Sequence, residues 1–401
     1  MEEAYYIFRR ATSVIYLDNA ATTPISKSVL DAMMPYLTEL YGNPGSSHSL
    51  GRGAASAVAQ ARERVGRLMH ANKENIIFTS GGSEGNHFAL LSRAEELLAA
   101  GKKHVLISSV EHDSVVRAAE RLVKLGFHVD ELPVNSEGCV LLKTIKSHIR
   151  PETGLISIMY VNNEVGSVND VCEIGSLCRK HGILFHTDCV QAAGYSEIDV
   201  DLMQCDFATI SSHKLYGPKG VGAVYVREPR KCSPLFAGGH NQEFGLRGGT
   251  ENVAGIVGFG QACQDALEDT DRRKHSSWLR ELFYTRLTEY VDPRSIHIHG
   301  YHEPMNRSRI LNLRFDDVDG ETLLMMLDSC GICVSSGSAC RAKEPKPSRT
   351  LVAMGVPAEK ARNCIRISFG CHNTEDEVCR AAQDMGNLVN TLRDIAYDSE
   401  D

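Results

Sequence analysis

A lysine near the middle of the chain stands where an amine nucleophile would be held rigidly. Lys214 lies in the segment Ser211–Gly220, SSHKLYGPKG, directly after an apolar strand expected at Phe207–Ile210. The strand end fixes the amine, and a partly dry site lowers the pKa of a lysine toward its nucleophilic form, which can make a Schiff base with an aldehyde. A solvated lysine in a turn is the alternative, but the whole ten-residue context favours the nucleophile.

A carboxylate follows a second apolar strand. Asp188 comes directly after the strand expected at Ile183–Thr187. Ligands of open α/β sheets bind at the carboxyl ends of the strands. A carboxylate there would keep a pyridinium nitrogen protonated, so that a pyridoxal ring could accept electrons from a substrate carbanion. The alternative is an aspartate that caps a helix N-terminus.

A third strand runs into a glycine-rich helix start. The segment Phe78–Asn86, FTSGGSEGN, contains Gly82 and Ser83. Free N–H groups at such a helix start bind anions, and Ser83 adds a hydroxyl donor. The pattern is neither a Walker A sequence nor a dinucleotide GxGxxG. It predicts either a phosphate cradle or an ordinary capped helix.

A cysteine lies in a run of small residues. Cys340 belongs to Val334–Arg341, VSSGSACR, and precedes the polar loop Lys343–Arg349. We expect it to be exposed and mobile, with cationic side chains close by, conditions that favour a thiolate nucleophile. The nearby pair Cys330 and Cys333 forms a lone CxxC, for which buried thiols are favoured over a metal site. No metal is predicted.

Spacing alone does not decide the roles of two further side chains. Arg366 lies in an alternating strand at Ile365–Phe369, where it either faces solvent or forms a fork for a carboxylate. His112 follows a strand expected at Val105–Ser109, so it either faces the same strand-end crevice or has a structural role.

The elements that position these residues alternate between strand and helix from about residue 14 to about residue 226. This alternation predicts an α/β domain with a largely parallel sheet covered on both faces. The expected strands are Val14–Leu17, Ile76–Thr79, Val105–Ser109, Leu155–Val161, Ile183–Thr187, Phe207–Ile210 and Gly222–Val226. The pattern then changes to a smaller α+β domain, with strands at Ile310–Phe315, Ile332–Val334 and Ile365–Phe369. We predict a large domain over residues 14–268 and a small one over residues 1–13 and 269–401, which carries the Cys340 loop.

Composition excludes several classes of protein. The 401 residues carry 43 basic and 51 acidic side chains, a net charge of −8, which disfavours a direct nucleic-acid-binding protein. No apolar run approaches the ~20 residues of a membrane span, and the N-terminus lacks the apolar stretch of a signal peptide. We therefore expect a cytoplasmic protein whose 13 cysteines are thiols rather than disulfides.

Together these segments resemble the class V aminotransferase group of pyridoxal-phosphate enzymes, and more narrowly the NifS/IscS-type cysteine desulfurases. The motifs that carry the resemblance, in the family's order, are Tyr16–Pro24, Gly42–Pro44, Val161–Gly166, Arg247–Asn252 and Arg366–Gly370. The resemblance implies the fold type I of pyridoxal-phosphate-dependent transferases, an α/β fold with a mainly parallel seven-stranded sheet and a smaller α+β domain.

The resemblance also assigns roles around the cofactor, pyridoxal 5′-phosphate. Lys214 resembles the Schiff-base lysine and proton shuttle, and His112 the histidine stacked on the ring. Asp188 matches the partner of the ring nitrogen, and Gln191 the contact to the phenolic oxygen. The residues that match the phosphate-binding set are Gly82, Ser83, Ser211, His213 and, from a neighbouring subunit, Thr250.

The implied reaction converts L-cysteine to L-alanine in a homodimer. Asn163 and Arg366 resemble the clamp for the substrate carboxylate, Asn163 also contacting the cofactor. Cys340 resembles the sulfur acceptor, which attacks the substrate sulfur and becomes a persulfide. A protein acceptor would then receive the sulfur for iron–sulfur assembly, tRNA thiolation or DNA sulfur modification. The alternatives are a selenocysteine lyase or another class V enzyme, and a catalytically silent sulfur-assembly scaffold.

Overall fold

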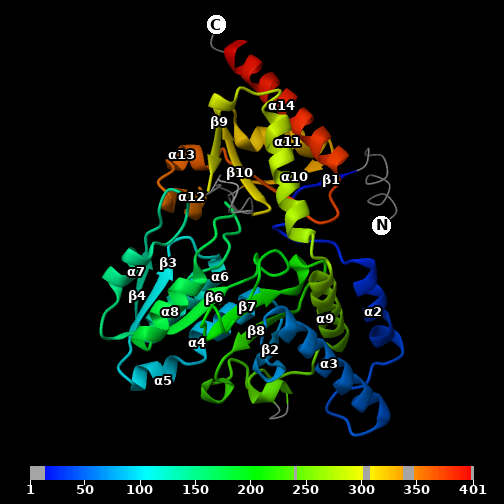
Figure 1. Cartoon of the computed structure of the whole chain (residues 1–401), viewed down its shortest axis with the longest axis vertical. Helices are drawn as coiled ribbons and strands as arrows, with labels where there is room; N and C mark the ends of the chain where they lie inside the picture. The colour runs from blue at the N-terminus through cyan, green and yellow to red at the C-terminus, as the bar shows by residue number, and fades with distance from the viewer. Residues whose placement is uncertain (1–13, 239–241, 301–307, 337–346, 399–401) are drawn as a thin grey trace.

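The computed structural model describes residues 14–238, 242–300, 308–336 and 347–398. A seven-stranded sheet occupies the lower part of the molecule in the view of Figure 1. Its strands, in spatial order, are β2 (Ile76–Thr79), β8 (Gly222–Val226), β7 (Phe207–Ser211), β6 (Leu184–Asp188), β5 (Thr153–Ser157), β3 (His104–Ser108) and β4 (His128–Leu132). All neighbours pair in parallel except β8, which is antiparallel to β2 and β7. The predicted mainly parallel sheet of seven strands is confirmed.

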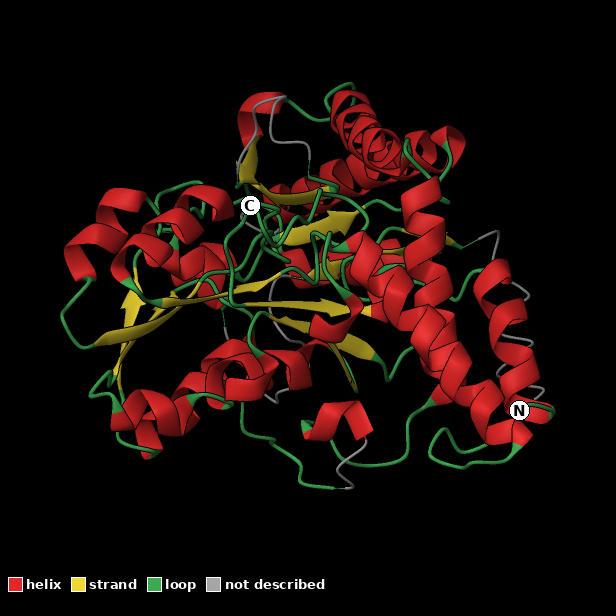
Figure 2. Cartoon of the chain, turned by 60° about the horizontal axis from the view of Figure 1, so that its bottom comes forward, coloured by secondary structure: helices red, strands yellow, loops and turns green. Residues whose placement is uncertain are grey.

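Helices cover both faces of this sheet, as Figure 2 shows. On β2, Ile76 and Phe78 belong to one hydrophobic cluster and Ile77 to the other, because successive side chains of a strand point to opposite faces. The helices of the first face are α2 (Lys27–Thr38), α3 (Ser49–Leu68), α7 (Leu142–His148), α8 (Val171–His181) and α9 (Val253–Glu268). Those of the second face are α4 (Gly82–Leu91), α5 (Ala94–Ala99) and α6 (Asp113–Lys124).

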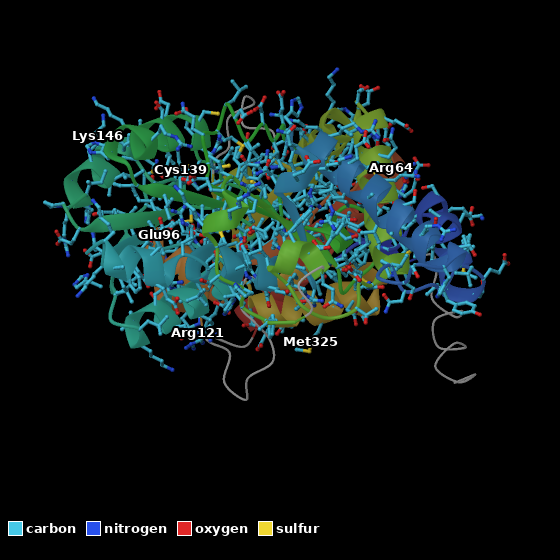
Figure 3. All side chains as sticks on the ribbon, turned by 90° about the horizontal axis from the view of Figure 1, so that it is seen from below. Arg64, Glu96, Arg121, Cys139, Lys146 and Met325 are labelled. Carbon is cyan, nitrogen blue, oxygen red and sulfur yellow. The ribbon has the colours of Figure 1, made fainter. Side chains whose placement is uncertain are left out.

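Polar side chains occupy the outside of these layers. Glu96 on α5, Arg121 on α6 and Lys146 on α7 are exposed and project from the covering helices (Figure 3). Within the described part of the chain, we find no helix whose length and apolar character would let it cross a bilayer.

A second sheet with its own core lies at the other end of the molecule (Figure 1). It is antiparallel, and its strands, in spatial order, are β12 (Ser335–Ser336), β13 (Ile365–Ser368), β10 (Ile310–Phe315) and β9 (Ile296–His299). The helices that pack in this core are α10 (Arg272–Leu287), α11 (Gly320–Ser329) and α14 (Glu375–Asp398).

The first predicted strand does not belong to the large sheet. Val14–Leu17 contributes β1 (Ile15–Tyr16), which pairs in parallel with β11 (Ile332–Cys333). Ile15 and Leu17 are buried in the hydrophobic cluster of the second sheet. The seventh strand of the large sheet is instead β4, HVDEL, an edge strand too polar to match the apolar pattern sought in the sequence.

Candidate active site

A cavity of about 400 Å³ opens at the carboxyl ends of the strands of the large sheet. The loops after β2, β3, β5, β6 and β7 line it on one side, and β13 of the second sheet lines it on the other. The predicted site residues that line it are Gly82, Ser83, His112, Asn163, Asp188, Gln191, Ser211, His213, Lys214 and Arg366.

One predicted site residue, Thr250, is not among the residues that line this cavity. Thr250 lines a separate cavity of about 170 Å³, together with Ser80 and Gly220. Cys340 lies outside the described residues. The roles predicted for both therefore stay predictions.

The amine of Lys214 lies at the end of β7, in the short 3₁₀ helix η2 (Ser212–Lys214). Its Nζ donates to the carbonyl oxygens of Ala20, at 2.5 Å, and Ala21, at 2.6 Å. Burial lowers the pKa of this amine to about 7, and the positive charges of Arg309 and Arg366 add to the effect. Much of the amine is therefore neutral at neutral pH, as a nucleophile or a proton acceptor requires.

Asp188 is the last residue of β6 and is buried at the cavity. Its Oδ1 accepts the backbone N–H of Val190 at 2.9 Å, and its Oδ2 accepts Nδ2 of Asn86 at 2.7 Å. The residues directly after Asp188 form turns and not an α-helix, so the alternative of a helix cap is wrong. Two hydrogen bonds from neutral donors leave the carboxylate free to hold a third, cationic N–H group.

His112 combines both roles that the sequence left open. It is the N-cap of α6, where its Nδ1 accepts the N–H of Ser114 at 3.1 Å, and it also lines the cavity. Because Nδ1 accepts this hydrogen bond, the proton of the neutral ring sits on Nε2. Ser114 Oγ lies 2.7 Å from the same Nδ1 and accepts Asn86 Nδ2 at 2.8 Å, so hydrogen bonds connect His112 to Asp188.

The glycine-rich segment forms the start of α4 and has the features of an anion cradle. The N-cap, Gly81, has a φ of 151° and no capping side chain, so the first N–H groups of the helix lack an intrahelical partner. A Cβ on Gly82 would come within 2.9 Å of the Val190 side chain, so a larger residue would crowd the cradle. Ser211 Oγ is buried there without a hydrogen-bond partner among the described residues. An adjoining cavity of about 370 Å³ shares Gly82, Ser211 and two other predicted phosphate ligands, Ser83 and His213.

His213 is a neutral donor or acceptor at this cradle. Burial, together with the charges of Lys214 and Lys219, lowers the pKa of its imidazole to about 4. Its Nδ1 lies 3.1 Å from Thr22 Oγ1. A neutral ring can hydrogen-bond an anion without adding a charge.

Arg366 points from β13 into the cavity and is buried, so it does not face solvent. Its Nη1 donates to the Asn163 carbonyl at 3.0 Å, and its Nη2 donates to Asp18 Oδ1 at 2.7 Å. Its Nε is buried without a partner among the described residues. The fork can therefore receive a carboxylate, which would compete with Asp18.

Three residues that hydrogen-bond to predicted site residues were not identified from the sequence. Asp18 accepts from Arg366, and Asn86 donates to Asp188. Arg309 donates from Nη2 to Gln191 Oε1 at 2.9 Å. Asp18 and Asn86 lie inside the motifs Tyr16–Pro24 and Phe78–Asn86, which was a usable signal. Arg309 precedes an apolar strand and carries no such signal.

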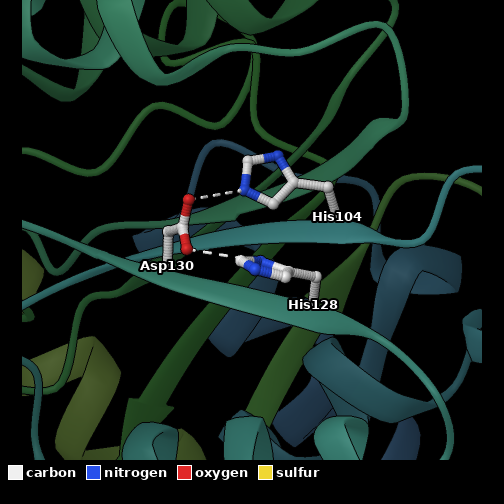
Figure 4. Close-up of side chains that lie close together, drawn as sticks. All are labelled: His104, His128 and Asp130. Carbon is white, nitrogen blue, oxygen red and sulfur yellow. Dashed lines mark hydrogen bonds and ion pairs between the residues drawn. The ribbon is translucent and has the colours of Figure 1, made fainter.

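Away from the cavity, a His–Asp–His cluster joins the last two strands of the sheet (Figure 4). Asp130 on β4 lies 3.2 Å from His104 Nε2 on β3 and 3.2 Å from His128 Nδ1. Their ligand atoms lie within 4.8 Å of one another, as a metal site would need. Arg150, however, contacts the same carboxylate at 2.5 Å and supplies its counter-charge. The cluster is therefore better suited to hold the edge strand β4 against β3 than to bind a cation.

Comparisons with known proteins agree with this geometry. The family model described as aminotransferase class-V matches residues 15–380. The cysteine desulfurase IscS of Dictyoglomus turgidum is 40% identical over 383 residues, covering 95% of this chain and 96% of the relative. A solved structure described as a NifS-like protein superposes with a TM-score of 0.86 at 33% identity, covering 94% of this chain and 100% of the other. A structure described as SspA in complex with cysteine has a TM-score of 0.78 at 34% identity, covering 90% and 99%.

Proposed function

The chain belongs to the aminotransferase class-V family, and we infer that it is a cysteine desulfurase that converts L-cysteine to L-alanine and passes the sulfur to an acceptor. One observation carries this inference. A lysine amine with a pKa near 7 and a carboxylate stand at neighbouring strand ends of one cavity, in a chain 40% identical to cysteine desulfurase IscS.

We propose pyridoxal 5′-phosphate as the cofactor, and the residues of the cavity fit it. The uncapped start of α4 and the unpartnered hydroxyl of Ser211 suit its phosphate. Asp188 suits its ring nitrogen, and His112 suits a ring face. When bound, this cofactor supplies an aldehyde for an amine and an electron-poor ring that delocalises negative charge from the substrate's α-carbon.

The chain's own residues then bind the substrate and move its protons. Arg366 binds the substrate carboxylate through its fork, beside the backbone of Asn163. Lys214, with a pKa of about 7, is neutral in about half of the molecules at pH 7 and can take the proton from the substrate's α-carbon, which it would then pass to the cofactor. The carbonyls of Ala20 and Ala21 hold the same amine at rest.

We propose Cys340 as the residue that receives the sulfur. Its thiolate attacks the sulfur of L-cysteine; the new S–S bond forms as the substrate's Cβ–S bond breaks. The electron pair of the broken Cβ–S bond stays with the three-carbon fragment, which takes up one proton at Cβ and becomes L-alanine, while the persulfide stays on Cys340.

The described flanks of the Cys340 segment support this role. Ser335, before the segment, pairs with Arg366 across β12 and β13. Beyond the segment, Ser348 and Thr350 donate to the buried carboxylate of Glu164, the residue after Asn163. Cys340 comes four positions after Ser336, a length of chain that spans at most about 14 Å. The described ends of the segment therefore lie beside Arg366 and next to Asn163, which supports the role proposed for Cys340.

We further propose that the protein acts as a homodimer. Leu30, Met34 and Leu37 form an apolar stripe along α2, with 44%, 46% and 57% of their surface exposed. A stripe of this kind is typical of an interface. In such a dimer Thr250 of the second copy would complete the phosphate site of the first. The acceptor is a protein of iron–sulfur assembly, tRNA thiolation or DNA sulfur modification.

A single substitution tests this function. Cys340→Ser should keep the visible absorbance of the bound cofactor and lose the formation of L-alanine from L-cysteine. Cys172→Ser, which changes an exposed cysteine on α8, is the matched control and should keep full activity. Full alanine formation by Cys340→Ser would contradict the persulfide mechanism. A protein that stays colourless with added pyridoxal phosphate would contradict the cofactor and revive the silent scaffold.

A further inference from the structure

A buried arginine beside the cavity has no acidic partner in the described part of the chain. Arg309 is 4% exposed and directly precedes β10. Its Nη2 donates to Gln191 Oε1 at 2.9 Å, and its guanidinium carbon lies 4.1 Å from the centre of the Tyr195 ring. Its Nε is buried without a hydrogen-bond partner among the described residues. A buried charge held only by neutral groups is costly and therefore calls for a specific function.

The first consequence concerns the orientation of the Gln191 amide. A guanidinium has only donors, so the atom of Gln191 that faces Arg309 must be the oxygen. The amide nitrogen then points away from Arg309, and one of its N–H groups donates to the Ala20 carbonyl at 2.8 Å. Gln191 lines the catalytic cavity. Arg309 thus fixes this side chain as an N–H donor on the cavity side.

The second consequence concerns charge at Lys214. Arg309 and Arg366 both disfavour a proton on this amine, while Asp18 and Asp188 favour one, and His213 beside it is neutral. Arg366 is paired with Asp18, which offsets its field. Arg309 has no such carboxylate among the described residues, and its charge is the larger of the two that lower the Lys214 pKa.

We propose that Arg309 is a positioning residue that holds the Gln191 amide as a donor toward the catalytic cavity and supplies the fixed positive charge that keeps the Lys214 amine neutral and nucleophilic. This role deepens the proposed function and rests on it, because it acts through Lys214 and Gln191.

The test measures how readily Lys214 reacts with acetic anhydride between pH 5 and 10 in the full-length, cofactor-free protein. Peptide mass spectrometry follows Lys214 itself, so the readout does not need turnover. The wild-type reactivity should reach half its maximum near pH 7, the pKa expected for this amine. In Arg309→Gln, which keeps an N–H donor but loses the charge, the midpoint should rise by about one unit. That shift corresponds to ~10-fold lower reactivity at pH 6.

Two variants separate the charge from a general loss of packing. Arg309→Lys restores the charge and should return the midpoint toward pH 7. Arg314→Gln is the matched control, because Arg314 is also a buried arginine of this strand region but is paired with Asp316. It should leave the midpoint unchanged. An unchanged midpoint in Arg309→Gln, or an equal shift in Arg314→Gln, would overturn the proposal.

A failure of the role proposed for Arg309 can be distinguished from a failure of the proposed function. Borohydride reduction of the cofactor-loaded protein should attach the cofactor to Lys214. If the adduct is found on another lysine, the proposed function fails, and the role of Arg309 fails with it. If the adduct is on Lys214 and the midpoint does not move, only the role of Arg309 is overturned.

Discussion

The two walls of the catalytic cavity are built in different ways. On one wall, Asp188, Lys214 and His112 lie at or just beyond the ends of parallel strands. Asp188 and His112 are linked through the side chains of Asn86 and Ser114. On the other wall, Arg366 lies inside the antiparallel strand β13 and Arg309 just before β10. Their side-chain partners, Asp18 and Gln191, come from distant parts of the sequence.

This difference separates the chemistry of the two walls. The strand-end wall presents an amine, a carboxylate and an imidazole, groups that exchange or hold protons. The second wall presents fixed positive charges, which can bind a carboxylate and which add to burial in lowering the pKa of the amine opposite. Changes on the first wall should therefore reduce kcat, and changes on the second should act on KM and on pH dependence.

The largest expected effect is that of Asp188→Asn, on the strand-end wall. The amide keeps the size of the side chain but cannot offer a negative charge to a cationic N–H group. We expect kcat for L-cysteine to fall by ~10²–10⁴-fold, the range of a proton-transfer contribution, with KM changed much less. Steady-state kinetics of alanine formation measures this.

The matched control is Asp206→Asn, just before the neighbouring strand β7. Asp206 is also a buried acid, and its Oδ2 accepts the N–H of Phe185 on β6 at 2.9 Å. Its loss should affect thermal stability rather than kcat. Equal losses of kcat in the two variants would mean that Asp188 acts only through the fold of β6.

A smaller effect is expected on the second wall, from Arg366→Gln. Loss of a charged hydrogen bond to a carboxylate costs about 1.5–3 kcal/mol, so kcat/KM should fall by ~10–150-fold, mainly through KM. Asp18→Asn removes the competing carboxylate and keeps the guanidinium, so KM should stay level or fall. A rise in KM for both variants would show that the ion pair is structural and that Arg366 does not bind the substrate.

The same division explains how far the sequence could predict the site. Lys214, Asp188 and Ser83 follow strands, and the strand-end rule places such residues at one edge of a parallel sheet without further information. Arg366 is inside a strand, where alternation alone cannot say which face is covered. The structure decides it, because Arg366 of β13 lines the cavity at the strand ends of the large sheet. Arg309 could be identified only from its contact with Gln191, which joins residues 118 positions apart.

Prediction from the sequence also failed for two strands of the fold, β4 and β1. The apolar inner strands of the large sheet were predicted because burial on both faces gives a continuous apolar run. The polar edge strand β4 was missed, and β1 was assigned to the wrong sheet. A two-residue strand carries no signal about its partner, since its pairing with β11 depends on how distant segments pack.

The smallest expected effect tests whether the strand-end wall works as a connected unit. Asn86 links Asp188 Oδ2 to Ser114 Oγ, and through it to His112. Asn86→Ala removes one hydrogen bond to the Asp188 carboxylate but leaves the bond from the Val190 N–H, so we expect a loss of about 1 kcal/mol, or about fivefold in kcat.

Ser114→Ala should cost a similar amount, because Ser114 Oγ contacts both Asn86 and His112. If the residues act as one network, the double variant should lose less than the product of the two single losses, since either change already breaks the connection. Multiplicative losses in the double-mutant cycle would show instead that Asp188 and His112 are positioned independently.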